Sequence, residues 1–128
     1  MKTVLVLLSQ LLVCSPLFAQ PAEVTPLMTK GLPDFAGKET LVITVDYPPG
    51  GASPVHRHNA HAFVYVLDGS IVMGVKGADS VTLTPGQMFY EGPNDIHTIS
   101  RNAGKTKPAK FLVFLLKDKS SPVQIPVQ

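Results

Sequence analysis

The sequence predicts an all-β protein, a single antiparallel β-barrel of the jelly-roll type. From residue 20 onward the apolar segments are short and rich in β-branched side chains, and almost none has the spacing of a helix. Turn residues separate them, drawn from the 12 prolines and 10 glycines of the chain. Short strands at regular spacing, with turn residues between them, are typical of a β-barrel or a two-layered β-fold.

Seven segments have the strand pattern and follow one another along the chain: 41–45, 62–67, 70–75, 80–84, 87–91, 96–100 and 110–116. Residues 80–84 alternate apolar and polar side chains, which predicts a strand with one buried face. Residues 110–116 are almost continuously apolar, which predicts a strand buried on both faces. Asp68-Gly69 is predicted to form a tight hairpin turn, because glycine readily takes the positive φ that such turns need.

The chain is predicted to hold one barrel domain. Residues 40–117 form the expected core, and residues 20–39 and 118–128 are polar, Pro-rich arms that could add edge strands. A length of about 109 residues after Ala19 suits one domain of ordinary size. The sequence contains no internal repeat and no domain linker, so a double barrel is not expected.

Residues 1–19 are interpreted as an export signal. Lys2 supplies the positive charge, residues 4–14 form the apolar run, and Ala19 offers a small residue at the cleavage site. The run is too short to span a bilayer comfortably, so no stable membrane insertion is expected after cleavage. The predicted location is therefore periplasmic or secreted. A lipoprotein anchored at Cys14 and an uncleaved anchor are the alternatives.

The charge balance argues against a nucleic-acid-binding protein, and the cysteine count argues against a core held by disulfides. The formal net charge is only +2, and the one basic concentration, residues 105–110, is interpreted as a solvated loop. Because binding to DNA or RNA needs a broad basic surface, no nucleic-acid partner is predicted. Cys14 is the only cysteine and would leave with the signal, so packing without disulfides has to hold the core together.

All four histidines fall in two short clusters: His56, His58 and His61 in the first, and His97 in the second. Neutral imidazole is the commonest protein ligand for transition metals. On an extended segment His56 and His58 point the same way, and His97 is the distant candidate for a third ligand. The clustering predicts one metal site closed by two stretches of chain. Polar surface histidines that are grouped by chance remain the alternative.

The order of these features resembles the cupins, small antiparallel barrels built as a jelly roll. The first cupin motif is matched by Gly50, five intervening residues, the pair His56 and His58, and a closing glycine at Gly69. The family's glutamate in this motif falls at Ala62, which cannot bind a metal. The resemblance therefore implies histidine ligands without that carboxylate, as in some cupin-type dioxygenases.

The segment from Pro85-Gly86 to Pro93 and then His97 resembles the second cupin motif, with Asn102 as the nearby asparagine. The stretch from Pro93 to His97 is one residue short, and Asn102 comes one residue late. The resemblance covers about residues 40–116, and it implies His56, His58 and His97 as the metal ligands.

Three further side chains are candidates for catalysis or for the open ligand position: His61, Tyr65 and Glu91. His61 is out of phase with His58 on an extended strand and should face away, unless a bulge at Asn59-Ala60 reverses its direction. Tyr65 could extend its hydroxyl into a cavity, with structural packing as the alternative. Glu91 could act as a ligand, orient an imidazole from the end of its strand, or face solvent.

The resemblance implies one divalent transition metal ion, with iron(II) first and zinc, manganese, nickel or copper as alternatives. Three functions remain open for an exported cupin of this kind. The first is a dioxygenase acting on a small enol, diketone, thiol or phenol. The second is a non-redox isomerase, lyase or hydrolase with His61 as the proton shuttle. The third is a non-catalytic module that binds a small ligand or a metal. A metal-free structural protein is a further alternative. Cupins commonly form dimers through edge strands, so the resemblance also implies a possible homodimer.

Overall fold

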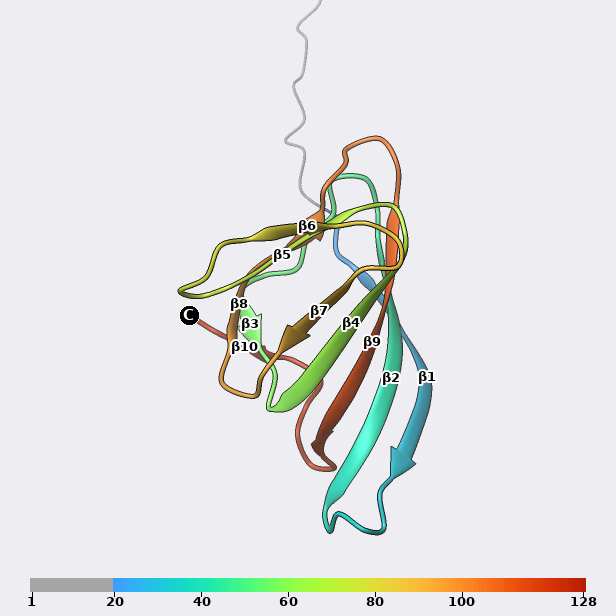
Figure 1. Cartoon of the computed structure of the whole chain (residues 1–128), viewed down its shortest axis with the longest axis vertical. Coiled ribbons are helices and arrows are strands. Elements are labelled where there is room, and N and C mark those ends of the chain that lie inside the picture. Colours follow the sequence, from blue (N-terminus) through green and yellow to red (C-terminus); the bar gives the residue numbers. More distant parts are fainter. Residues whose placement is uncertain (1–19) are drawn as a thin grey trace, which may run out of the picture.

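A computed structural model describes residues 20–128 and shows an all-β protein (Figure 1). The predicted export signal and Cys14 lie outside the described residues. Within residues 20–128 the chain forms ten strands in two five-stranded sheets, and it contains no helix. The prediction of an all-β, jelly-roll fold is confirmed. No helix in this part of the chain is long and apolar enough to cross a membrane.

The strands follow one another in this order: β1 (Glu23–Gly31), β2 (Lys38–Tyr47), β3 (His56–Arg57), β4 (Ala60–Asp68), β5 (Ile71–Val75), β6 (Val81–Leu83), β7 (Met88–Glu91), β8 (Ile96–Asn102), β9 (Ala109–Asp118) and β10 (Ile125–Pro126).

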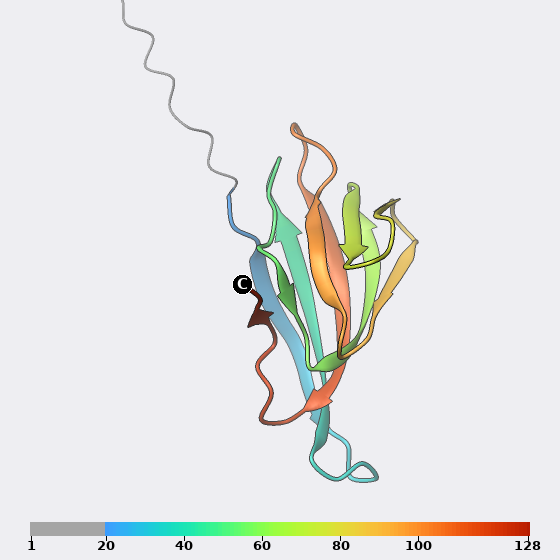
Figure 2. The same ribbon diagram turned by 90° about the vertical axis from the view of Figure 1, so that its left-hand side faces the viewer.

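The two sheets are built from strands that lie far apart in the sequence. One sheet has the order β1-β2-β9-β4-β7 and lies on the right in Figure 1, and the other has the order β10-β3-β8-β5-β6. All pairings are antiparallel. Figure 2 shows the same two layers after a quarter turn. The N-terminal arm supplies β1 and the C-terminal arm supplies β10, so both arms add edge strands.

Strand β4 shows how the core forms. Its residues alternate strictly between buried and exposed positions, with Ala60, Ala62, Val64 and Val66 facing inward. Successive side chains of a strand point to opposite faces, so one face of β4 joins the core and the other stays on the surface. Inward-facing side chains of β2 and β9, together with Ile71 and Met73 of β5, complete a single cluster of buried apolar side chains.

Two predictions about strand environment are wrong. Strand β9 is not buried on both faces, because Phe114 on its outer face is 38% exposed while Phe111, Val113 and Leu115 are buried. The Asp68-Gly69 turn does not join two paired strands, because β4 and β5 belong to different sheets. The turn instead carries the chain from one sheet to the other, and Gly69 adopts a φ of 69° there.

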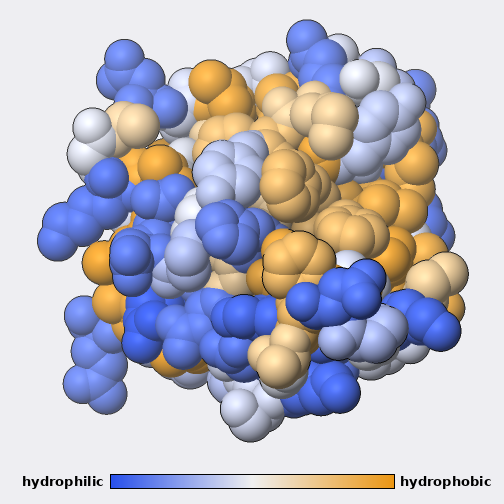
Figure 3. Space-filling model, turned by 60° about the horizontal axis from the view of Figure 1, so that its bottom comes forward, coloured by the Kyte–Doolittle hydropathy of each residue, from blue (hydrophilic) through white to orange (hydrophobic). Residues whose placement is uncertain are grey.

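The outer face of the first sheet is unusually apolar. Its exposed large apolar side chains come from β4, β7 and β9: Phe63, Tyr65, Leu67, Met88, Tyr90 and Phe114. Figure 3 shows apolar side chains gathered in a continuous area on one face of the molecule, beside a polar area. The apolar character of residues 110–116 therefore reflects this surface as well as the core.

Candidate metal centre

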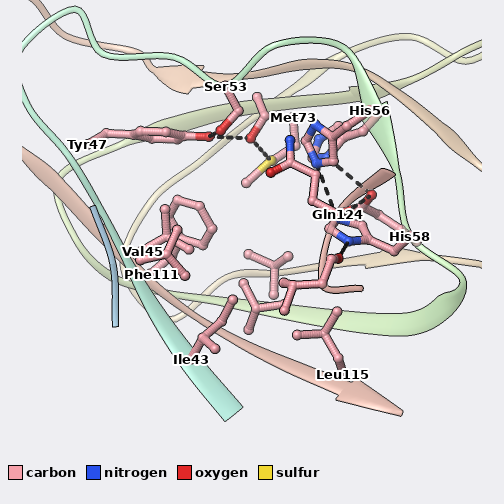
Figure 4. Close-up of a pocket in the computed structure, with 17 residues that line it drawn as sticks. Ile43, Val45, Tyr47, Ser53, His56, His58, Met73, Phe111, Leu115 and Gln124 are labelled. Carbon is pink, nitrogen blue, oxygen red and sulfur yellow. Dashed lines mark hydrogen bonds and ion pairs between the residues drawn. The ribbon is translucent and has the colours of Figure 1, made fainter. Parts of the chain in front are cut away.

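Three histidines come together at one end of the space between the sheets. His56 on β3 is the direct partner of His97 on β8, and His58 follows β3 by one residue. The side chains of His97 and His58 are only 3% and 12% exposed. Each histidine offers a ring nitrogen within 4.8 Å of those of the other two. The structure thus joins the two histidine clusters of the sequence, and Figure 4 shows His56 and His58 side by side.

Backbone carbonyls orient two of the rings. His56 Nδ1 donates to the carbonyl oxygen of Pro54 over 2.7 Å, and His58 Nδ1 donates to that of Val123. A carbonyl only accepts, so both rings carry their proton on Nδ1 and keep a lone pair on Nε2. The two Nε2 atoms lie 3.2 Å apart. Two lone pairs at that distance repel each other unless a cation or a proton lies between them.

The separation of these nitrogens fits a shared metal ion. Two imidazole nitrogens bound at about 2.1 Å, at angles between a right angle and tetrahedral, lie about 3.0–3.4 Å apart. The observed 3.2 Å between the Nε2 atoms of His56 and His58 falls within that range. A carbonyl that holds Nδ1 is also the usual way in which proteins orient a metal-binding imidazole.

His97 supplies the third donor. Both of its ring nitrogens are buried and without a hydrogen-bond partner among residues 20–128. The ring of Phe89 lies nearly parallel to it, with the centroids 6.1 Å apart. An unpaired buried polar group is costly, and a bound ion would remove that cost. His97 therefore fits a metal ligand better than a structural core histidine.

Burial also keeps one imidazole neutral. Burial lowers the pKa of His56 from its ordinary value of 6.5, and the neighbouring His58 and His97 lower it further, against the hydrogen bond to Pro54. Only a neutral imidazole can donate a lone pair to a metal. The burial that limits access to the site thus also favours the protonation state that binding needs.

Glu91 at the end of β7 joins the three histidines. Its side chain is 3% exposed, and its Oε2 lies 3.1 Å from His97 Nδ1 and 3.9 Å from His58 Nε2. The contact with His97 is short but not aligned as a hydrogen bond, so Oε2 has no partner within the described residues. The group consists of three imidazole rings and one buried carboxylate.

A cavity of about 60 Å³ extends from the histidines into the core, with room for a few water molecules. Its far side carries Tyr47, whose hydroxyl lies 2.6 Å from Ser53 Oγ and 2.7 Å from Ser100 Oγ. Apolar side chains such as Ile43 and Val45 line another side of the cavity, below Tyr47 in Figure 4. Burial raises the pKa of Tyr47, so its phenol stays neutral and can donate one hydrogen bond.

The family model described as a cupin domain matches residues 43–115, which is more than half of the chain. The chain belongs to the cupin family. No curated protein matches it in sequence.

Solved structures share the fold at low sequence identity. A recombinant oxalate oxidase in complex with glycolate is 23% identical with a TM-score of 0.64, over 82% of this chain and 54% of that one. The polyketide cyclase RemF of Streptomyces resistomycificus is 21% identical with a TM-score of 0.62, over 84% and 71%. The DMSP lyase DddQ of Ruegeria pomeroyi DSS-3 is 20% identical with a TM-score of 0.60, over 69% and 43%. This cupin spans less than half of the lyase chain, and the likeness shows the fold alone.

The other two candidate residues lie outside the cavity of this cupin. His61 is exposed on the outer face of β4, where its Nδ1 lies 2.7 Å from the Tyr90 hydroxyl. The pairing of β4 with β9 is regular from Ala60 to Val66, so no bulge there turns His61 inward. Tyr65 is 40% exposed on the same outer face. Neither side chain reaches the three histidines.

Several cavity residues escaped the sequence analysis. Tyr47 shares the inward face of β2 with Ile43 and Val45, so the alternation along that strand would have placed it in the core. The carbonyl of Val123 carries no sequence signal at all, because any residue supplies one. It reaches His58 because β10 pairs with β3, which draws the C-terminal arm across the site.

Proposed function

We propose that this cupin binds one divalent transition metal ion through His56, His58 and His97. The observation that carries the proposal is the pair of Nε2 atoms 3.2 Å apart, each with its Nδ1 held by a carbonyl, beside an imidazole that lacks hydrogen-bond partners. Imidazole-rich sites accept most of the first transition row, and iron(II) is our first candidate, before zinc, manganese, nickel and copper.

For the activity of this site we propose oxidation of a small organic molecule with dioxygen, as a cupin-type dioxygenase. The metal would supply a Lewis acid and a route for electrons when bound. The protein supplies a small, mostly apolar cavity, with the Tyr47 hydroxyl as a polar group on its wall. A cavity of about 60 Å³ favours a substrate of few atoms. The fold shared with an oxalate oxidase supports this class without selecting the substrate.

A non-redox lyase or isomerase is the second candidate, and one observation favours it. Such chemistry needs a proton-transfer group inside the cavity, and the Oε2 atom of Glu91 is buried there without a hydrogen-bond partner in the described chain. His61, the proton shuttle expected from the sequence, lies on the outer face and does not serve this purpose. The fold shared with a DMSP lyase is compatible with this class.

The test begins with elemental analysis of the protein expressed with residues 1–19, so that its own export route is used. The wild type is compared with His58→Ala. Near-stoichiometric iron in the wild type alone would support the dioxygenase, and small enols and thiols are then screened with an oxygen electrode. Zinc or manganese with turnover under anaerobic conditions would support the lyase or isomerase. Metal binding without turnover would leave a ligand-binding cupin, and absence of metal after reconstitution would contradict the proposed site.

A further inference from the structure

The first cupin motif of this chain lacks its carboxylate, because Ala62 stands at the glutamate position, yet a buried carboxylate lies beside the histidines. We propose that Glu91 is the fourth metal ligand and that it acts from strand β7 in place of a residue at position 62 of strand β4. The inference rests on the proposed metal site and adds one ligand to it.

Strand register places the two positions opposite each other. Ala62 on β4 is the direct antiparallel partner of Glu91 on β7. Directly opposed residues of an antiparallel pair project from the same face, with Cβ atoms about 4.5–5.5 Å apart. Both residues are buried, Ala62 at 0% and Glu91 at 2% exposure. A carboxylate on position 91 therefore reaches into the same region of the barrel as one on position 62.

The size of the residue at position 62 agrees with this exchange. The methyl side chain of Ala62 is small and leaves room on the inner face of β4 for the neighbouring Glu91 side chain. Glutamates at both positions would bury two carboxylates against each other, and like charges at such distances oppose ionisation. One carboxylate and one small side chain is the arrangement that a single ligand position requires.

The contacts of Glu91 fit one coordination shell. Ligand atoms bound at about 2.1 Å to one metal lie between about 3.0 and 4.2 Å apart, from right-angled to opposite positions. Glu91 Oε2 lies 3.1 Å from His97 Nδ1 and 3.9 Å from His58 Nε2. Within the described part of the chain no group donates an aligned hydrogen bond to this oxygen. A buried carboxylate without donors is costly, and coordination of a cation offsets that cost.

The alternative role is a positioning one, in which Glu91 orients His97 by a hydrogen bond and never touches the metal. The two roles differ in what they do to the metal's own spectrum. Loss of a ligand changes the donor set and therefore the visible absorption of bound Co(II). Loss of a positioning contact weakens binding but leaves the donor set as it was.

The experiment titrates the protein, expressed with residues 1–19, with Co(II) and records both affinity and the visible spectrum. Glu91→Gln removes the charge at nearly constant shape, and Asp79→Asn removes an exposed carboxylate in the turn between β5 and β6 as the matched control. We expect Glu91→Gln to lose affinity by at least about 100-fold and to shift the Co(II) bands, while Asp79→Asn matches the wild type.

The double variant Ala62→Glu/Glu91→Ala moves the carboxylate back to strand β4. We expect it to bind Co(II) within about tenfold of the wild type, and to recover a four-ligand spectrum. This variant also keeps the inference testable if Glu91→Gln fails to fold, which circular dichroism would reveal.

Two results would overturn the inference alone: wild-type affinity in Glu91→Gln, or weaker binding with the wild-type Co(II) spectrum. If the wild-type protein itself takes up no Co(II), the proposed metal site fails and this inference fails with it. Weaker binding with a shifted spectrum, recovered in the double variant, supports Glu91 as the ligand.

Discussion

Polar side chains on the two faces of the β4–β7 pair lie in opposite environments, one buried beside the histidines and the other exposed. On the inner face Ala62 opposes Glu91, whose carboxylate lies beside the histidines. On the outer face His61 meets Tyr90 in an exposed contact of 2.7 Å. His61 is close to His58 in sequence and does not reach the three-histidine group, whereas Glu91 is distant in sequence and does. Strand parity and register, rather than closeness along the chain, decide which polar side chains can contribute to the same site.

The same contrast recurs on neighbouring rungs of the β2–β9 ladder. Lys117 pairs with Glu39 over 2.8 Å on the inner side, with 5% and 16% exposure, and Lys38 pairs with Asp118 over 2.7 Å at 45% and 51%. Lys117 Nζ also donates to the carbonyls of Asp118 and Ser121. These bonds hold the turn that leads to Val123, so the buried lysine supports the arm that orients His58.

The largest expected effect is the loss of metal binding when a histidine of the inner face is replaced. His97→Ala and His58→Ala should each lose stoichiometric metal, with affinity down at least about 100-fold, because each removes one of three nitrogen donors. His61→Ala is the matched outer-face variant and should keep full metal content. Metal analysis after dialysis against a weak chelator measures this, with circular dichroism as the control for folding. Full metal content in both His58→Ala and His97→Ala would contradict the site.

The two lysines give the next effect. Lys117→Met should lower the free energy of unfolding by about 2 kcal/mol, because it leaves Glu39 largely buried without its partner. Lys38→Met removes an exposed pair and should cost less than about 1 kcal/mol. Urea unfolding of the metal-free proteins measures both. Equal losses in the two variants would show that burial does not distinguish the pairs.

The parts of the fold that follow from local pattern were predictable from the sequence, and those that depend on partners were not. The apolar, β-branched residues 62–67 were recognisable as a strand, and strand parity implied that His61 faces away from His58. The apolar run 110–116 misled, because alternate residues lie on an apolar outer face that the run does not distinguish from core. The two-residue strands β3 and β10 have no pattern of their own and exist only through pairing.

The site divides in the same way. Histidine spacing and the cupin resemblance were enough to predict His56, His58 and His97 as a group. Glu91 was one candidate among several, because its position opposite Ala62 depends on the register of β4 and β7. Strands β5 and β6 separate these two strands in the sequence, so no local pattern indicates that register. The contribution of Val123 is a backbone oxygen placed by tertiary structure alone.

The smallest expected effect compares a buried tyrosine with an exposed one. Tyr47 is 1% exposed and Tyr90 is 50% exposed. At neutral pH Tyr47→Phe removes the hydroxyl contacts with Ser53 and Ser100 and should lower the free energy of unfolding by about 1 kcal/mol. Tyr90→Phe removes only an exposed contact with His61 and should cost less than that.

Alkaline pH sharpens the same comparison. Burial raises the pKa of Tyr47 above its ordinary value of 10.0, so above that pH the unfolded chain ionises this phenol before the folded protein does. Tyr47 therefore contributes stability that is complete below pH 10 and is lost as the pH rises through its folded-state pKa. Urea unfolding of wild type, Tyr47→Phe and Tyr90→Phe on both sides of about pH 10 measures this. The alkaline loss of stability should be shallower in Tyr47→Phe than in Tyr90→Phe, and equal slopes would mean that the Tyr47 phenol ionises as readily in the fold as in the unfolded chain.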